Sequence, residues 1–146
     1  MKVTAMPPSG YYQISTKQKN DIVAQISAFL ARQSEIVFAF LYGSFLTETF
    51  FRDIDIGIYV NQMSPAEFST YENRLAYLLA KESNFSWPME VKIINIAPVS
   101  FDFQVMRGKL LFTQDDDLLS DLMVATARKY LDMAPLRRHY IREAMA

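Results

Sequence analysis

A short apolar run, Ile36–Tyr42, constrains the fold of this chain more than any other stretch. Because it is brief, rich in β-branched and aromatic residues, and ends at a glycine, its composition predicts a buried strand. The dipeptide Gly43-Ser44 follows at once, and eight residues separate it from Asp53-Ile54-Asp55, which opens a second strand-like run that continues to Val60. Residues two apart on a strand project from the same face, so we expect both aspartates on one side of the sheet.

These two aspartates and the Gly43-Ser44 turn indicate a nucleotide site. Two carboxylates held so close repel each other, and a divalent cation is the usual compensation. A small-residue turn beside them offers backbone N–H groups and a hydroxyl to a phosphate. Each feature also has a plainer interpretation. The aspartates would then be solvent-facing acids on an edge strand, and Ser44 would cap the short turn before Phe45.

Length and composition limit the classes of protein that fit. The chain has 146 residues, of which 51% are hydrophobic, so we expect one domain with a sizeable core. A net charge of −1 provides no global basic field, which argues against a nucleic-acid or membrane partner. The chain has no cysteine, which excludes disulfides and thiolate metal sites. Met1–Gly10 lacks the apolar core of a secretory signal, and the longest apolar run is too short to cross a bilayer, so we expect a cytoplasmic protein.

Helical and strand-like segments alternate along the chain. Ser15 and Gln18 stand at the positions of a capping box, which predicts a helix start there and an end near Gln33. Ser64-Pro65 predicts a second helix start, with the serine as its cap. Pro135 is expected to kink or end the last helix.

Residues 1–14 are expected to form an irregular lead-in, and residues 15–146 a single domain. Further segments are predicted as a strand at Met89–Ile96, a short helix at Pro98–Arg107, an edge strand at Lys109–Phe112 and a helix that begins with Asp115-Asp116-Asp117. The order of these segments predicts an α/β or α+β domain, a sheet with helices packed on it and a helical C-terminal region.

Glu90 is the natural candidate for a third acid in the site. A two-metal site requires several oxygen ligands, and two aspartates on one strand rarely suffice. Glu90 is the acidic residue of an otherwise apolar strand, where an unpaired carboxylate would cost roughly several kcal/mol by desolvation. If its strand lies beside the one with the aspartates, Glu90 reaches the same metal ions. The alternative is a structural ion pair with Lys92 or Arg52.

Several segments, in order along the chain, resemble one known family. The signature is Gly43-Ser44 followed, after eight residues, by Asp53-Ile54-Asp55. The likeness extends to Leu41–Phe45, Phe51–Asp55, the acid-led strand Glu90–Pro98, Gln104–Phe112 and Tyr130–Leu136. Together these segments resemble the DNA polymerase β-type nucleotidyltransferases, and the size of the chain is similar to that of the minimal nucleotidyltransferases of the MntA antitoxin kind.

The resemblance implies a polymerase β-like nucleotidyltransferase fold, in which helices pack on a small mixed sheet. It implies that Gly43 and Ser44 bind the nucleotide phosphates, and that Asp53, Asp55 and Glu90 are the catalytic metal ligands, for two Mg²⁺ ions with ATP as substrate. Antitoxins of this kind transfer AMP from ATP to a tyrosine of a HEPN-domain RNase toxin and so silence it. We therefore expect an ATP- and Mg²⁺-dependent protein adenylyltransferase that acts as an antitoxin.

Two departures from the family pattern keep other functions open. Glu90 stands where aspartate is more common, and the spacer between Ser44 and Asp53 is shorter than is usual in the superfamily. One alternative is therefore a catalytically weak antitoxin that neutralises its toxin by binding. Another is a nucleotidyltransferase for a small molecule, which normally needs an added substrate domain.

Three basic residues could belong either to the site or to the ordinary protein surface. Arg52 and Lys109 could each reach the nucleotide, with ordinary surface positions as the alternative. His139 is the only histidine and lies far along the chain from the acids. We therefore expect it on a solvated helix face, and no Ser-His-Asp arrangement is indicated.

Overall fold

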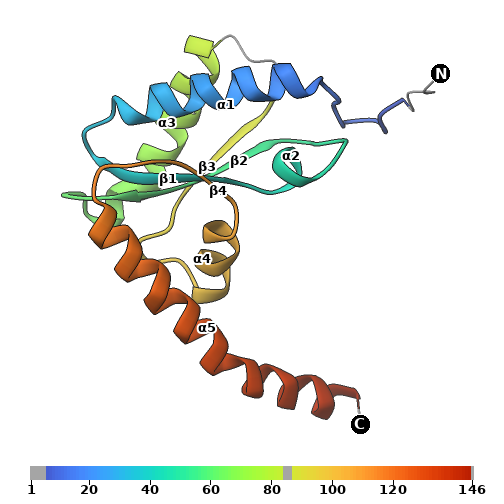
Figure 1. Cartoon of the computed structure of the whole chain (residues 1–146), viewed down its shortest axis with the longest axis vertical. Helices are drawn as coiled ribbons and strands as arrows, with labels where there is room; N and C mark the ends of the chain where they lie inside the picture. Colours follow the sequence, from blue (N-terminus) through green and yellow to red (C-terminus); the bar gives the residue numbers. More distant parts are fainter. Residues whose placement is uncertain (1–5, 84–86, 146) are drawn as a thin grey trace.

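A four-stranded mixed sheet forms the centre of the molecule (Figure 1). The computed structural model describes residues 6–83 and 87–145. The strands are β1 (Ile36–Tyr42), β2 (Ile54–Val60), β3 (Met89–Ile93) and β4 (Lys109–Thr113), in the spatial order β3-β2-β1-β4. β1 is antiparallel to β2 and β4, whereas β2 and β3 are parallel. The mixed sheet implied by the family resemblance is confirmed, and the apolar run forms β1 with every residue buried.

Helices cover both faces of this sheet (Figure 1). α1 (Thr16–Ala31) and α3 (Phe68–Ser83) lie on one face, and α4 (Val99–Met106) and α5 (Asp116–Met145) lie on the other. Because successive side chains of a strand point to opposite faces, the strands supply two separate cores. The core beside α1 includes Ile26, Leu30, Leu41, Ile56 and Leu79, and the core beside α4 includes Phe38, Phe40, Tyr42, Ile94 and Val105.

Ser15 and Gln18 form the predicted capping box at the start of α1. The backbone N–H of Gln18 donates to the Ser15 hydroxyl over 3.1 Å, and the N–H of Ser15 donates to the Gln18 side chain over 3.0 Å. The helix ends at Ala31, close to the predicted end. Burying each large apolar side chain contributes about 1.5–3 kcal/mol, which holds α1 on the sheet. The buried stripe consists of Ile22, Ile26, Phe29 and Leu30.

The second predicted helix start is a 3₁₀ turn rather than a serine-capped α-helix. Pro65–Glu67 forms this turn, and α3 begins at Phe68. Ser64 has an extended backbone at the N-cap position, but its side chain makes no capping hydrogen bond. The N–H of Glu67 instead donates to the backbone oxygen of Ser64 over 2.9 Å, so the turn is closed by the main chain.

β3 ends at Ile93, short of the predicted Ile96, because a side chain replaces the backbone ladder. The Asn95 side-chain amide donates to the carbonyl oxygen of Val60 over 2.7 Å and accepts from its N–H over 3.0 Å. These two bonds satisfy the end of β2, and the chain turns away towards α4.

α5 continues through Pro135 to Met145, so Pro135 does not end the last helix. A proline inside a helix removes one N–H and crowds a carbonyl group in the preceding turn. Leu131, one turn earlier, is 63% exposed, and the helix projects away from the sheet (Figure 1), so water can satisfy that carbonyl. No helix in the described residues, α5 included, is long and apolar enough to span a membrane.

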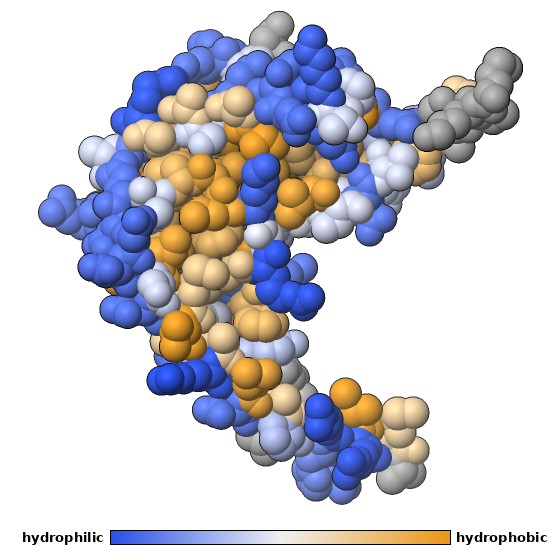
Figure 2. All heavy atoms as spheres, viewed as in Figure 1, coloured by the Kyte–Doolittle hydropathy of each residue, from blue (hydrophilic) through white to orange (hydrophobic). Residues whose placement is uncertain are grey.

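Apolar side chains are also exposed on the outside of the molecule. Figure 2 shows them gathered over the sheet, between α1 and α5. Leu110 on β4 and Met123 and Val124 on α5 are 38–48% exposed. They line a hollow of about 390 Å³ that no described segment covers.

Candidate functional site

Three carboxylates converge where β2 and β3 begin. Asp53 directly precedes β2, Asp55 is its second residue, and Glu90 is the second residue of β3. β2 and β3 are parallel, and their register pairs Asp55 with Glu90. One oxygen atom from each of the three side chains lies within 4.8 Å of the others. The parallel pairing therefore brings together the three acids that the sequence singled out.

The charges of this cluster act on each other. Burial, together with the neighbouring carboxylates of Asp53 and Glu90, raises the pKa of Asp55 to about 7. Without a counter-ion, the cluster therefore holds a proton near neutral pH. Three carboxylates with converging oxygen atoms are also the donor set that Mg²⁺ prefers, so the residues fit this ion.

Glu90 is not the buried carboxylate that its apolar strand predicted. β3 is an edge strand of the sheet, and half of the Glu90 side chain is exposed, at 50%. Its carboxylate lies 3.7 Å from the Lys92 amine, which is the ion pair considered as the alternative. Because half of the Glu90 side chain is exposed, its charge does not require a metal ion for compensation. Its position beside the aspartates nevertheless allows it to coordinate a metal ion that they bind.

Gly43 is required by its backbone and by its neighbour. Its φ of +86° and ψ of −164° lie in a region that is essentially restricted to glycine. A Cβ atom built on Gly43 would lie only 2.3 Å from Oδ2 of Asp55. The turn after β1 therefore packs directly against one of the three carboxylates.

Ser44 begins the short helix α2 (Ser44–Thr47), which lies in the connection between β1 and β2. Gly43 is the N-cap of this helix, and no side-chain hydrogen bond caps it. The Ser44 hydroxyl has no hydrogen-bond partner among the described residues, and its side chain is partly exposed. The interpretation of Ser44 as a cap is therefore not borne out.

Tyr42 is a part of the site that the sequence did not single out. It is buried at the end of β1 and pairs with Asp55 across β1 and β2. Burial raises the pKa of its hydroxyl, and the charges of Asp55, Glu90 and Asp53 raise it further, so the hydroxyl stays protonated. Its position directly before Gly43 is the sequence feature that could have indicated a place in the site.

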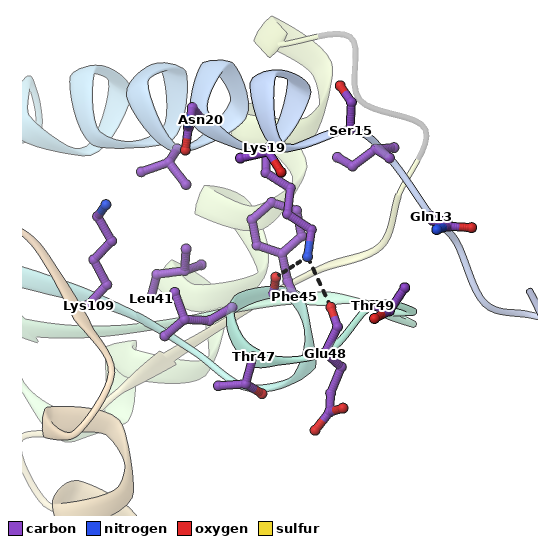
Figure 3. Close-up of a pocket in the computed structure, with 14 residues that line it drawn as sticks. Gln13, Ser15, Lys19, Asn20, Leu41, Phe45, Thr47, Glu48, Thr49 and Lys109 are labelled. Atoms are coloured by element: carbon purple, nitrogen blue, oxygen red, sulfur yellow. Dashed lines mark hydrogen bonds between the residues drawn. The ribbon is translucent and has the colours of Figure 1, made fainter. Parts of the chain in front are cut away.

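Lys19, on α1, holds α2 in place on the side of the sheet that α1 covers. Its amine donates to the backbone oxygens of Phe45 over 2.8 Å and Glu48 over 3.0 Å (Figure 3). It also lies 5.2 Å and 5.7 Å from the ring centroids of Phe45 and Phe51. Lys19 lies three residues before the apolar Ile22, so both face the same side of the helix. This spacing is the sequence feature that could have indicated an inward-facing lysine.

A hollow of about 580 Å³ lies beside Lys19 rather than at the carboxylates (Figure 3). Lys109 points into it towards α1 and pairs with Leu41 in the sheet, so it lies away from the carboxylate cluster. The Arg52 guanidinium lies 5.9 Å from the Tyr11 ring centroid. His139 is exposed on α5, 3.9 Å from Glu143, as expected for a solvated helix face.

The chain is similar to a nucleotidyltransferase family and to chains of solved toxin–antitoxin structures. The family model described as "Polymerase beta, Nucleotidyltransferase" matches residues 24–117. No curated protein has a significant match to the chain.

Solved structures match over nearly the whole chain. A chain in the complex of tri-AMPylated Shewanella oneidensis HEPN toxin with MNT antitoxin has a TM-score of 0.65 and 23% identity, over 88% of this chain and 99% of that one. A chain of a toxin–antitoxin solved with AMP-PNP has a TM-score of 0.65 and 25% identity, over 85% and 98%. A chain of the toxin–antitoxin MntA-HepT has a TM-score of 0.60 and 22% identity, over 90% and 100%. These likenesses confirm the polymerase β-like fold. Because the family model covers more than half of its 146 residues, the chain belongs to the polymerase beta nucleotidyltransferase family.

Proposed function

We propose that this protein is an ATP- and Mg²⁺-dependent adenylyltransferase antitoxin, which transfers AMP to a tyrosine of a HEPN-domain RNase toxin and so neutralises it. The observation that carries the proposal is the convergence of Asp53, Asp55 and Glu90 oxygens within 4.8 Å of one another, against the Gly43 turn. Membership of a nucleotidyltransferase family supports the class of reaction.

In this proposal Asp53, Asp55 and Glu90 hold Mg²⁺, and Gly43 and Ser44 receive the triphosphate. Bound Mg²⁺ supplies positive charge to the phosphates and to the leaving pyrophosphate. The Ser44 hydroxyl has no described partner and is available to donate to a phosphate oxygen. Gly43 has no side chain, so a phosphate can approach its backbone closely.

The transfer itself exchanges one bond to phosphorus for another. The tyrosine oxygen of the partner forms a bond to the α-phosphorus of ATP while the bond to the bridging oxygen breaks. Pyrophosphate leaves, and the hydroxyl proton passes to a carboxylate of the cluster or to water. Asp53 and Asp55 are partly exposed and Glu90 is exposed, so a tyrosine on another protein can reach them. The chain contributes by orienting the reactants and compensating charge.

Similar solved structures support the choice of partner and nucleotide. One contains a tri-AMPylated HEPN toxin with an MNT antitoxin, and another, 25% identical to this chain, is a toxin–antitoxin with AMP-PNP, an analogue of ATP. A HEPN protein encoded beside the gene for this chain is the first partner to test.

The exposed position of Glu90 favours a second candidate, an antitoxin that neutralises by binding alone. Glu90 already has an ion-pair partner in Lys92, at 3.7 Å, and its side chain is 50% exposed. If this pair persists when nucleotide binds, the cluster lacks its third ligand and transfers AMP slowly. Neutralisation would then come from covering the toxin.

Intact-mass spectrometry separates the two candidates. The protein is mixed with Mg²⁺, ATP and the HEPN partner, and the mass of the partner is followed with time. The proposal predicts additions of about 329 Da, the mass of one covalently attached AMP unit. Peptide mapping should locate the addition on a tyrosine.

The double variant Asp53→Asn/Asp55→Asn is the matched control, because each change keeps the shape of the side chain and removes its charge. Labelling should disappear in this variant. If it persists, the assigned site is wrong. Full neutralisation of the toxin with an unchanged mass would favour the binding candidate.

A further inference from the structure

A small hollow adjoins the carboxylate cluster on the α4 side of the sheet. Its volume is about 250 Å³, and its lining includes Tyr42 and Gly43 from the end of β1 and Gln104 and Arg107 from α4 and its end. Tyr42 pairs with Asp55 in the sheet, and a Cβ atom on Gly43 would touch Oδ2 of Asp55 at 2.3 Å. The hollow and the carboxylate cluster therefore share a wall.

Arg107 is oriented at this hollow by two stacked rings. Its guanidinium lies 5.7 Å from the ring centroid of Phe103, one turn earlier on α4. Phe103 in turn stacks on Tyr130 of α5, with centroids 3.9 Å apart and planes at 10°. A guanidinium held over a ring face keeps its N–H donors for a ligand in its own plane. Arg107 is exposed and forms no ion pair with a carboxylate of the described residues.

Gly108 brings Arg107 against the end of β1. A Cβ atom on Gly108 would lie 2.2 Å from the backbone oxygen of Leu41 and 3.1 Å from Cβ of Tyr42. A residue with a side chain would push the α4–β4 turn away from β1. The glycine therefore fixes the neighbouring Arg107 beside the Gly43 turn.

The other basic residues near the site are already engaged or face elsewhere. Lys92 lies 3.7 Å from the Glu90 carboxylate, Lys19 donates to two backbone oxygens, and Lys109 lines the hollow beside α1. Arg52, directly before Asp53, has its guanidinium 5.9 Å from the Tyr11 ring centroid. Of the described lysines and arginines, only Arg107 lines the hollow that Gly43 lines. Three carboxylates and a triphosphate carry more negative charge than two Mg²⁺ ions neutralise, so a further cation beside the phosphates would stabilise the bound nucleotide.

We infer that Arg107 binds the β- and γ-phosphates of a nucleoside triphosphate whose phosphate tail occupies this hollow, with Phe103 and Tyr130 as positioning residues. The planar fork of an arginine matches two phosphate oxygens at once, which a lysine cannot do. The inference rests on the proposed function, because it assumes that a nucleotide binds at the Gly43 turn.

The test measures nucleotide binding rather than AMP transfer. Arg107→Gln is titrated with AMP-PNP and with AMP, each in the presence of Mg²⁺, by calorimetry or by NMR where binding is weak. Loss of a charge-assisted contact should weaken AMP-PNP binding about 10- to 100-fold and change AMP binding by less than about threefold. Arg107→Lys keeps the charge without the fork, so it should lie between the wild type and Arg107→Gln.

Arg74→Gln is the matched control. Arg74 is also an exposed arginine over an aromatic ring, 5.4 Å from the Tyr71 centroid, but it lines a hollow at the opposite end of β1 and β2. This variant should bind both nucleotides like the wild type. Circular dichroism and thermal unfolding of all variants confirm that they are folded.

Each other outcome has a distinct meaning. Equal affinity of Arg107→Gln and the wild type for AMP-PNP would overturn the inference and leave the proposed function standing. Equal weakening for AMP-PNP and AMP would also overturn it, because Arg107 would then act at the adenosine or α-phosphate. A wild-type protein that binds no AMP-PNP with Mg²⁺ would contradict the proposed function itself.

Discussion

Asp55 and Glu90 belong to the same carboxylate cluster but are held in different ways. Asp55 lies on β2, inside the sheet, and packs so closely on Gly43 that any side chain there would displace its carboxylate. Glu90 lies on the edge strand β3, with half of its side chain exposed and Lys92 as an ion-pair partner. Packing against Gly43 therefore restricts where the Asp55 carboxylate can lie, whereas solvent and an ion pair surround Glu90.

Substitutions of these two carboxylates should therefore disturb metal binding to different degrees. A carboxylate restricted by packing offers Mg²⁺ an oxygen atom at a defined position, and its loss removes that ligand from the interior side of the cluster. A ligand at the edge can adjust, and water can take its place in the coordination shell. The contribution to AMP transfer should therefore fall from Asp55 to Glu90 to Lys92.

The largest effect is expected for Asp55→Asn. The amide keeps the shape of the side chain but removes the charge at the fixed end of the cluster. The initial rate of AMP transfer, measured from the mass of the HEPN partner, should fall by more than about 100-fold, beyond the usual loss of an outer-shell partner. A rate within about tenfold of the wild type would show that Asp55 is not a metal ligand.

Glu90→Gln should have a smaller effect, about 10- to 100-fold on the same rate, because water can replace an exposed ligand. Glu90→Asp restores the residue more common in the family and keeps the charge, so it should retain most of the activity. If Glu90→Gln is as damaging as Asp55→Asn, the two carboxylates are equally constrained and Glu90 is not the more adjustable ligand.

Gly43→Ala tests the packing that fixes Asp55. The alanine would have to adopt a backbone conformation that costs about 1–3 kcal/mol, and its Cβ would displace the Asp55 carboxylate. We expect a lower unfolding free energy in urea and weaker Mg²⁺-AMP-PNP binding. Gly10→Ala is the control, since Gly10 also has a positive φ, +81°, but its Cβ would meet nothing within 4 Å. That variant should share the strain and keep nucleotide binding.

The raised pKa of Asp55 predicts a pH-dependent stability of the metal-free protein. Its value of about 7 lies above the ordinary 3.8, so between these values the folded state holds more protons than the unfolded state. The unfolding free energy should therefore fall as the pH rises from about 4 to about 7. Thermal unfolding in EDTA should show a weaker fall in Asp55→Asn. Burial also raises the pKa of Asp102, to about 6, so the difference between the two proteins is the informative quantity.

Magnesium should reverse this trend. Protons compete with Mg²⁺ for Asp55, so the rise in melting temperature on adding Mg²⁺ should grow from pH 6 to pH 8. Asp55→Asn should show little rise at any pH. An equal Mg²⁺ effect at pH 6 and pH 8 in the wild type would contradict competition at this residue.

Lys92→Met should have the smallest effect. An exposed ion pair contributes less than about 1 kcal/mol, so the urea midpoint should change little. Removing the amine also releases Glu90 towards the cluster, so AMP transfer should stay equal or rise slightly. A large loss of transfer would mean that Lys92 itself binds the nucleotide.

Much of the fold and the cluster was predictable from local sequence patterns. The run Ile36–Tyr42 forms β1 with the predicted bounds, and Ser15 and Gln18 form the capping box, because each depends on residues close together in the chain. The closeness of Glu90 to the aspartates followed from placing its strand beside theirs.

The remaining features depend on contacts between distant segments. Strand order places β3 at the edge, which exposes Glu90, and no local pattern specifies that order. Lys19 donates hydrogen bonds to Phe45 and Glu48, which lie 26 and 29 residues further along the chain. Asn95 ends β3 by bonding to Val60, 35 residues away. The hollow beside Arg107 likewise brings together residues of β1, α2 and α4, with Gly108 packed on β1.

The most direct test of the carboxylate cluster as the metal site is a crystal structure with Mn²⁺ and AMP-PNP, because Mn²⁺ replaces Mg²⁺ at oxygen sites and gives an anomalous signal. We expect anomalous peaks within coordination distance of Asp53, Asp55 and Glu90, with the triphosphate bound beside Gly43 and the metal. Strong peaks elsewhere, or a nucleotide bound away from these carboxylates, would contradict this assignment.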